Sequence, residues 1–186
     1  MDSLSTQLLT NPTAYTGIQL RPHWIYETTG TLGNALIVFQ GPCDVSLDKM
    51  VDLEDIRKNA PIFSQEMVHF MGEFFIDSLE QGILLQHLLV MTVYGWLWEH
   101  GINELSRRGN DIFFQNRKLS VSIATKSPIS ILIHLGVNVK TEGTPIPTSG
   151  LAELKIDPKV FAKGCLDCFS RDYEIWRTAR YKVSPR

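Results

Sequence analysis

The sequence predicts an α+β fold in which an antiparallel or mixed sheet carries helices on one face. Residues 110–151 alternate between apolar and polar side chains at period two, which is typical of paired strands. Residues 78–99 and 157–180 instead repeat apolar side chains every three or four positions, which is typical of helices packed on a core. No internal repeat or second core is visible, so we expect one domain over residues 1–186.

Short apolar runs and turn residues predict the elements of the first half. We expect a loose terminus over 1–14, strands over 15–27 and 34–39, a short strand over 50–53, a helical turn over 53–58 and a strand over 67–76. Pro22 interrupts the first strand in this prediction, and Gly41 with Pro42 ends the second.

The second half begins with the clearest helix, which Ser78 can cap and Gly101 stops. A short strand at 104–105 precedes the hairpin of 117–125 and 129–139, which turns at 126–128. Asp157 followed by Pro158 predicts the start of the last helix, because aspartate caps a helix and proline suits its first position.

The hairpin defines the candidate site. Its strands each carry an apolar face, and matching these faces places Lys118 near Gly136 and Ser120 near His134. The opposite, open face is then lined by small and polar side chains, namely Lys118, Ser120, His134, Gly136 and Asn138. Small side chains beside one long cation leave room for a ligand.

Each candidate residue has a functional and a structural interpretation. The ammonium of Lys118 could polarise a carbonyl or hold a phosphate, or it could be a solvated strand lysine. His134 could act as acid, base or donor, or be a structural group, and Asn138 could orient a ligand or bond to a loop. Thr148 could be a catalytic nucleophile only with a base beside it, whereas hydroxyls in such a Gly/Pro loop usually bond locally.

The cysteines and the acidic residues do not predict a metal site. Cys165 and Cys168 form a CxxC inside the last predicted helix without a second ligand pair, so we expect core packing. Cys43 is a single turn thiol that we expect to be structural. The acidic residues lack EF-hand spacing and favour a solvated surface; they are Asp48, Asp52, Glu54 and Asp55. The sequence contains no phosphate-binding glycine motif, and no other motif in it indicates a particular cofactor.

Composition limits the partners. The net charge of −2 and the pI near 6.2 disfavour a nucleic-acid partner, although the basic segment 171–186 leaves RNA contact as an alternative. Three cysteines indicate a reducing compartment, and no segment has the pattern of a signal peptide or membrane span, so we expect a cytoplasmic protein without a membrane partner. We expect a small-molecule ligand, and the sequence is compatible with a homo-oligomer as well as with a monomer.

Two resemblances follow from the motifs. The segments LRPHWIYETTG, VFQGPCDV, MVDLEDIR and RKLSVSIATKSPISILIHLGVNV resemble the uncharacterised family known as domain of unknown function 366. The series WLWEHGI, ELSRRG, DIFFQNRKLSVSIA, ILIHLGVNV and PIPTSGL is similar to the biotin/lipoate protein ligase and octanoyltransferase superfamily.

The second resemblance implies that Lys118 occupies the position of the acyl- or adenylate-contacting lysine. It also implies that Asn138 matches the asparagine of an LNV motif and that His134 lies beside the histidine of that strand. The octanoyltransferase cysteine would fall at Thr148 or Ser149, and the glycine- and arginine-rich loop is missing from 59–75, where His69 and Glu73 could line a pocket. We therefore expect an enzyme-like protein that binds a carboxylate- or acyl-bearing small molecule, or else a non-catalytic ligand-binding or protein-interaction module that has lost the chemistry.

Overall fold

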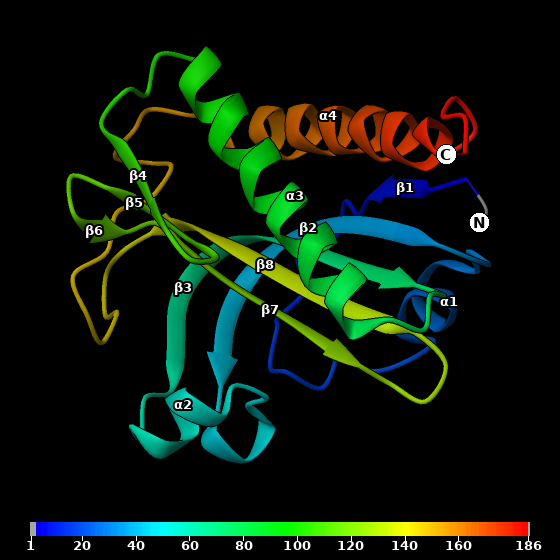
Figure 1. Ribbon diagram of the computed structural model, residues 1–186. Coiled ribbons are helices and arrows are strands. Elements are labelled where there is room, and N and C mark those ends of the chain that lie inside the picture. Colours follow the sequence, from blue (N-terminus) through cyan, green and yellow to red (C-terminus); the bar gives the residue numbers. More distant parts are fainter. Residues whose placement is uncertain (1–2, 186) are drawn as a thin grey trace.

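The computed structural model describes residues 3–185 and builds them around a five-stranded mixed sheet (Figure 1). Its strand order is β1 (Ser5–Leu8), β2 (Ala35–Val45), β3 (Ile62–Phe74), β8 (Ile131–Lys140) and β7 (Ser120–Lys126). β1 runs parallel to β2, and the other neighbours are antiparallel. The predicted α+β class is confirmed.

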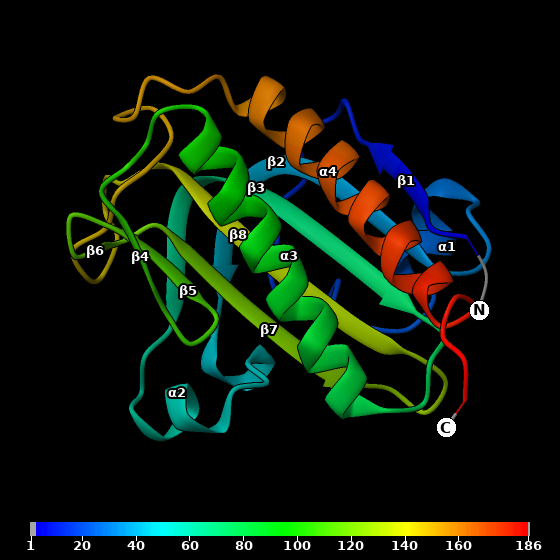
Figure 2. The same cartoon turned by 45° about the horizontal axis from the view of Figure 1, so that its top comes forward.

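Two long helices cover one face of this sheet, as Figure 2 shows. α3 (Leu79–Glu99) and α4 (Pro158–Ala179) begin where capping predicted. Ser78 accepts a hydrogen bond from the Gln81 N–H, and Asp157 accepts from the N–H groups of the second and third residues after it. None of the helices within residues 3–185 has the length and apolar character that a bilayer crossing requires.

The main core lies between the sheet and these helices. Five of the alternating residues predicted for the apolar face of the hairpin enter it from β8: Ile131, Ile133, Leu135, Val137 and Val139. Val121 and Ile123 of β7 were predicted for the same face but line the cleft on the opposite face of the sheet. Phe161 of α4 is fully buried there and meets Phe70 of β3 and Trp96 of α3 edge-on. This layer makes the helix-covered face of the sheet a sealed one.

The smaller elements lie at the margins of the sheet. They are α1 (Trp24–Thr29), the 3-10 turn η1 (Leu47–Lys49), α2 (Leu53–Arg57), and the three-stranded sheet of β4 (Leu105–Arg108), β5 (Asp111–Phe114) and β6 (Arg117–Lys118). The long strands β2 and β3 carry α2 away from the body of the molecule (Figure 1). This projecting segment stands opposite the helix-covered face.

The N-terminal prediction was wrong in two places. The expected loose terminus contains β1, while residues 1 and 2 lie outside the described chain. The expected strand over 15–27 is a series of turns that ends in α1. The backbone reverses here because Gly17 and His23 adopt positive φ, and the buried carboxylate of Glu73 accepts the His23 N–H at 3.0 Å.

Two further boundaries differ from the prediction. β2 continues through Gly41 and Pro42, because a bulge between Gly41 and Cys43 absorbs the proline, which has no N–H to donate. The strand expected at 50–53 is absent, and Asp52 instead caps α2 by accepting the N–H groups of Glu54 and Asp55.

The predicted hairpin exists, but its register is shifted by three residues, so that Ser120, which was expected opposite His134, pairs with Val137. Val121 pairs with Gly136 and Ile123 with His134. The cause is a break between β6 and β7, where Leu119 and Ser120 both face the helix-side core instead of alternating. Lys118, before the break, keeps its predicted direction, whereas the residues after it change faces.

Candidate functional site

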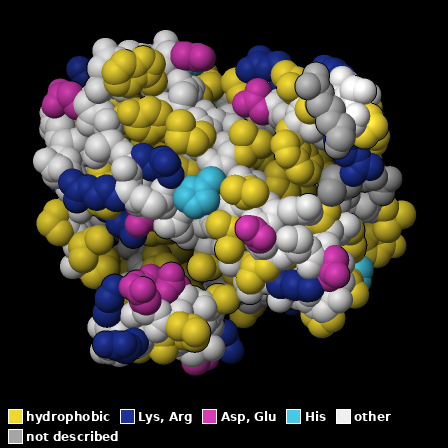
Figure 3. All heavy atoms as spheres, viewed as in Figure 1, with side chains coloured by type: hydrophobic (Ala, Val, Ile, Leu, Met, Phe, Trp, Pro, Cys, Tyr) yellow, Lys and Arg dark blue, Asp and Glu magenta, His cyan; other side chains and the backbone are white. Residues whose placement is uncertain are grey.

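The open face of the sheet forms one wall of a cleft of about 550 Å³, and α2 with its flanking loops forms the opposite wall. Figure 3 shows the hollow between the projecting α2 segment and the body of the molecule. Five residues of the inner wall concern the chemistry below: Tyr15, Asp111, Lys118, His134 and Asn138. This volume suits a small organic ligand.

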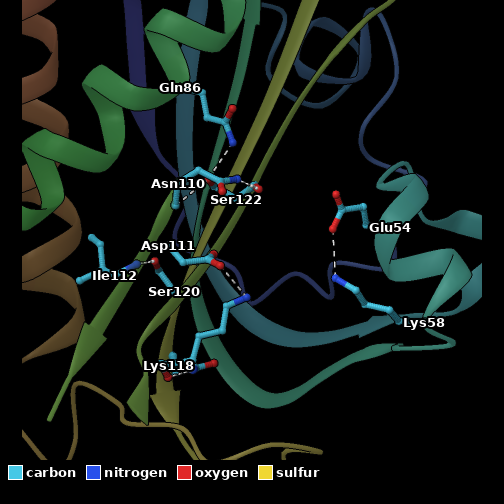
Figure 4. Close-up of polar contacts among 10 residues, drawn as sticks. Glu54, Lys58, Gln86, Asn110, Asp111, Ile112, Lys118, Ser120 and Ser122 are labelled. Carbon is cyan, nitrogen blue, oxygen red and sulfur yellow. Dashed lines mark hydrogen bonds and ion pairs between the residues drawn. The ribbon is translucent and has the colours of Figure 1, made fainter. Parts of the chain in front are cut away.

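Lys118 is the cation of the inner wall. Its Nζ lies 2.8 Å from Asp111 Oδ2, and both side chains are only 23% exposed. Figure 4 shows the two side chains directed toward each other, with Glu54 and Lys58 of α2 across the gap. Burial raises the pKa of Asp111, while Lys118 opposes this shift and lowers it. An ammonium has three donors, so Lys118 keeps N–H groups for a ligand beside Asp111.

Asn138 and Thr148 hold the backbone of Lys118. Asn138 Nδ2 donates to the Lys118 carbonyl at 3.3 Å, and Thr148 forms a parallel bridge with Lys118. The Thr148 hydroxyl lines the cleft, but it bonds to the hydroxyl of Thr144 at 2.8 Å. The hydroxyl of Thr148 thus stands beside the lysine, and its hydrogen bond among the described residues is to another hydroxyl and not to a basic side chain.

His134 and His69 form a buried pair on the same face. His134 Nε2 lies 3.0 Å from His69 Nδ1, and His69 Nε2 lies 3.1 Å from the carbonyl oxygen of Gly41. Tyr15 stacks on His134 with ring centroids 3.6 Å apart. Burial lowers the pKa of His69 to about 4 and that of His134 well below its ordinary value. Both imidazoles are therefore neutral at pH 7.

Two predicted pocket residues lie elsewhere. Ser120 is fully buried and accepts the Ile112 N–H at 2.9 Å, away from the gap in Figure 4, because of the break at Leu119. Its predicted place on the open face was wrong. Glu73 accepts hydrogen bonds from His23 and Ser130 and does not line the cleft. His69 lies behind His134 and reaches the cleft only through it.

The three cysteines lie in the structural positions that were expected. Cys165 is fully buried in the main core of α4, and Cys168 packs against it. Cys43 is buried in β2, and burial raises the pKa of its thiol to about 12. No cluster of histidine, cysteine or acidic side chains within residues 3–185 could hold a metal ion.

Sequence reasoning missed Asp111 and Tyr15. Asp111 lies within the alternating stretch of 110–151, and its ion pair with Lys118 depends on the β5–β6 hairpin. Tyr15 was assigned to a strand, whereas it approaches His134 through a bridge to Cys43. Both contacts join segments far apart in the sequence, and no local pattern predicts them.

Solved structures of biotin and lipoate ligases share this fold. A putative lipoate protein ligase of T. acidophilum with bound lipoic acid superposes with a TM-score of 0.61 at 13% identity, covering 91% of this chain and 86% of its own. The biotin protein ligase of Aquifex aeolicus in complex with biotin and ATP gives 0.60 at 16% identity, covering 95% and 72%. The chain therefore has a biotin/lipoate protein ligase-like fold.

Residues 4–184 match the family described as Domain of unknown function (DUF366), and the chain belongs to that family. A protein of unknown function from Pyrococcus horikoshi gives a TM-score of 0.95 at 40% identity, covering 99% of this chain and 100% of its own. An uncharacterized protein of Methanocaldococcus jannaschii is 36% identical over 76% of this chain; the aligned part spans 66% of that relative.

Proposed function

We propose that the cleft binds a carboxylate- or acyl-bearing small molecule whose carbonyl or carboxylate meets Lys118. The observation that carries this proposal is the position of Lys118, largely buried on the inner wall of a cavity of about 550 Å³. A partly desolvated ammonium interacts more strongly with an anion or a carbonyl than a solvated one does. One fold neighbour is a complex with lipoic acid, and another is a complex with biotin and ATP. Lipoic acid and biotin are both carboxylic acids.

The surrounding residues define the separate roles in this proposal. Asp111 holds the ammonium in place, and Asn138 fixes the backbone that carries it. His134 lines the inner end of the cleft, where it would orient the ligand, and His69 acts only through His134. The three cysteines Cys43, Cys165 and Cys168 are all free, which supports the cytoplasm as the compartment in which this binding takes place.

Binding without chemistry is the second candidate, and the contacts of Thr148 favour it. A threonine nucleophile requires an adjacent base, and the described partner of this hydroxyl is the hydroxyl of Thr144. In this version the protein is a ligand-binding module that keeps the fold of the ligases. In this case Thr148→Ala leaves ligand affinity unchanged, and neither the wild type nor the variant forms an acylated product. An acyltransferase that uses Thr148 as its nucleophile would form product only as the wild type.

Calorimetric titration and thermal shift with octanoate, lipoate and biotin, each with and without ATP, test the proposal. A ligand that binds the folded state alone raises the melting temperature by mass action. We expect at least one acid to stabilise the wild type and to lose most of its effect in Lys118→Met, which keeps the aliphatic stem and removes the charge.

Lys126→Met is the matched control. Lys126 lies on β7 of the same sheet, but it pairs with Asp77 and does not line the cleft. This variant should bind like the wild type. If the wild type and Lys118→Met bind the ligand equally, or if both variants lose the same amount of affinity, Lys118 does not contact the ligand.

A further inference from the structure

The hydrogen bonds of the histidine pair determine where its protons lie. A carbonyl oxygen only accepts, so the contact between Gly41 and His69 requires the hydrogen of His69 on Nε2. In a neutral ring Nδ1 of His69 is then an acceptor, and the 3.0 Å contact requires a hydrogen on Nε2 of His134. His134 is therefore left with an unprotonated Nδ1.

This nitrogen faces the cleft. Among residues 3–185, no buried side-chain nitrogen or oxygen lacks a hydrogen-bond partner. Nδ1 of His134 has no partner among the described residues, so it must be reachable from outside, and His134 borders the cleft. The ring is only 3% exposed and is stacked on Tyr15, which fixes its orientation.

Other acceptors lie on the same wall. Asn138 uses its Nδ2 to hold Lys118, which leaves its carbonyl oxygen as an acceptor. The carboxylate of Asp111 faces the cleft and has only one described partner, Lys118. A ligand with a carboxylate alone would satisfy Lys118 but would leave Nδ1 of His134 and the side-chain oxygen of Asn138 unpaired. An unpaired buried acceptor reduces affinity.

We propose that His69 fixes the tautomer of His134, so that Nδ1 of His134 accepts a hydrogen bond from an O–H or N–H group of the ligand. The inference rests on the proposed function and narrows its ligand class. The acid that fits the cleft carries a donor, such as a hydroxyl or an amide or ureido N–H, away from its carboxylate. His69 is a positioning residue, and His134 is the residue that sets specificity.

The tautomer is tested on the protein without ligand. Nitrogen-15 NMR of the histidine rings at pH 7 should show His134 with a protonated Nε2 and a bare Nδ1. His69→Phe keeps an aromatic ring but removes the acceptor, so His134 should become a mixture of tautomers. His69→Gln restores a donor and an acceptor and should restore the single tautomer. A wild-type His134 protonated on Nδ1, or tautomers that do not respond to His69→Phe, would overturn the assignment.

The ligand class is tested by calorimetry with two pairs of probes, octanoate against 8-hydroxyoctanoate and lipoate against biotin. The donor-bearing member of at least one pair should bind about tenfold more tightly to the wild type, as one hydrogen bond to a desolvated acceptor allows. His134→Phe, which keeps the stacking on Tyr15, should abolish the difference. Equal affinities within both pairs overturn this inference and leave the proposed function standing, whereas failure of all four probes to bind overturns both.

Discussion

The buried histidine pair should make the stability of this protein depend on pH in a defined way. His69 is fully buried, and its ring contacts His134, Tyr15 and Phe39, none of which is anionic at neutral pH. Its pKa falls from 6.5 to about 4 on folding, because burial disfavours the imidazolium. In the unfolded chain the same ring takes up a proton near pH 6.5.

The sign follows from the number of protons bound. Between pH 6.5 and pH 4 the unfolded state binds the proton and the folded state does not, so acid favours unfolding. The stabilising effect is present above the unfolded pKa and is lost as the pH falls toward the folded pKa. A change from 6.5 to about 4 corresponds to about 3 kcal/mol in total, of which about 2 kcal/mol is lost between pH 7 and pH 5. His134, whose pKa is also lowered, adds to the same trend.

Urea unfolding at several pH values between 7 and 5 measures this effect, with His69→Gln as the variant. Glutamine can donate and accept hydrogen bonds but does not titrate. The difference in unfolding free energy between wild type and variant therefore reports the titration of His69 together with its effect on the pKa of His134. We expect this difference to shrink by about 2 kcal/mol on going from pH 7 to pH 5. His87→Gln is the control, because His87 is only partly buried on α3 and contacts Arg107. A wild-type advantage over His69→Gln that stays constant with pH would refute the reasoning.

Four other outcomes are expected. Asp157→Ala should lower the urea midpoint by removing the cap of α4, and Asp157→Asn should restore it. Phe161→Ala should cost about 3–5 kcal/mol of unfolding free energy, because the ring is fully buried. Differential scanning calorimetry should show Gly41→Ala to be strongly destabilised, because the new Cβ would lie 2.0 Å from the carbonyl oxygen of Thr13. Gly95→Ala has open space around the new Cβ in α3 and should gain about 0.5–1 kcal/mol of unfolding free energy. Elemental analysis should find no stoichiometric zinc on the CxxC of α4; one zinc per chain would contradict core packing.

Periodicity and capping predicted the elements that depend on local chemistry. α3 and α4 follow from their apolar spacing and from Ser78 and Asp157, and β8 follows from a long uninterrupted alternation. The N-terminal errors have a different origin. β1 is a short edge strand with little apolar character, and the turns before α1 depend on the distant carboxylate of Glu73. Neither can be recognised within a local window.

The candidate site was predicted in part for a related reason. Lys118 and His134 were placed on one face by alternation, and both do line the cleft. Ser120 was misplaced, because two successive residues, Leu119 and Ser120, face the core. This irregularity is set by β5, whose Ile112 exchanges backbone and side-chain hydrogen bonds with both residues. Alternation predicts the faces of regular strands and fails where a neighbouring strand imposes a bulge.

The composition of the open face is itself an argument for function. His69 and His134 lie among Phe39, Met67 and Met71, in a second apolar cluster where a purely hydrophobic filling would avoid the desolvation of two imidazoles. The fold does not require them, since the helix-covered face of the same sheet is filled by aliphatic and aromatic side chains. Their hydrogen bonds end at one unprotonated nitrogen on the cleft wall. A binding site requires polar groups directed toward a cavity. Selection for stability alone would replace such groups in an apolar layer by hydrophobic side chains.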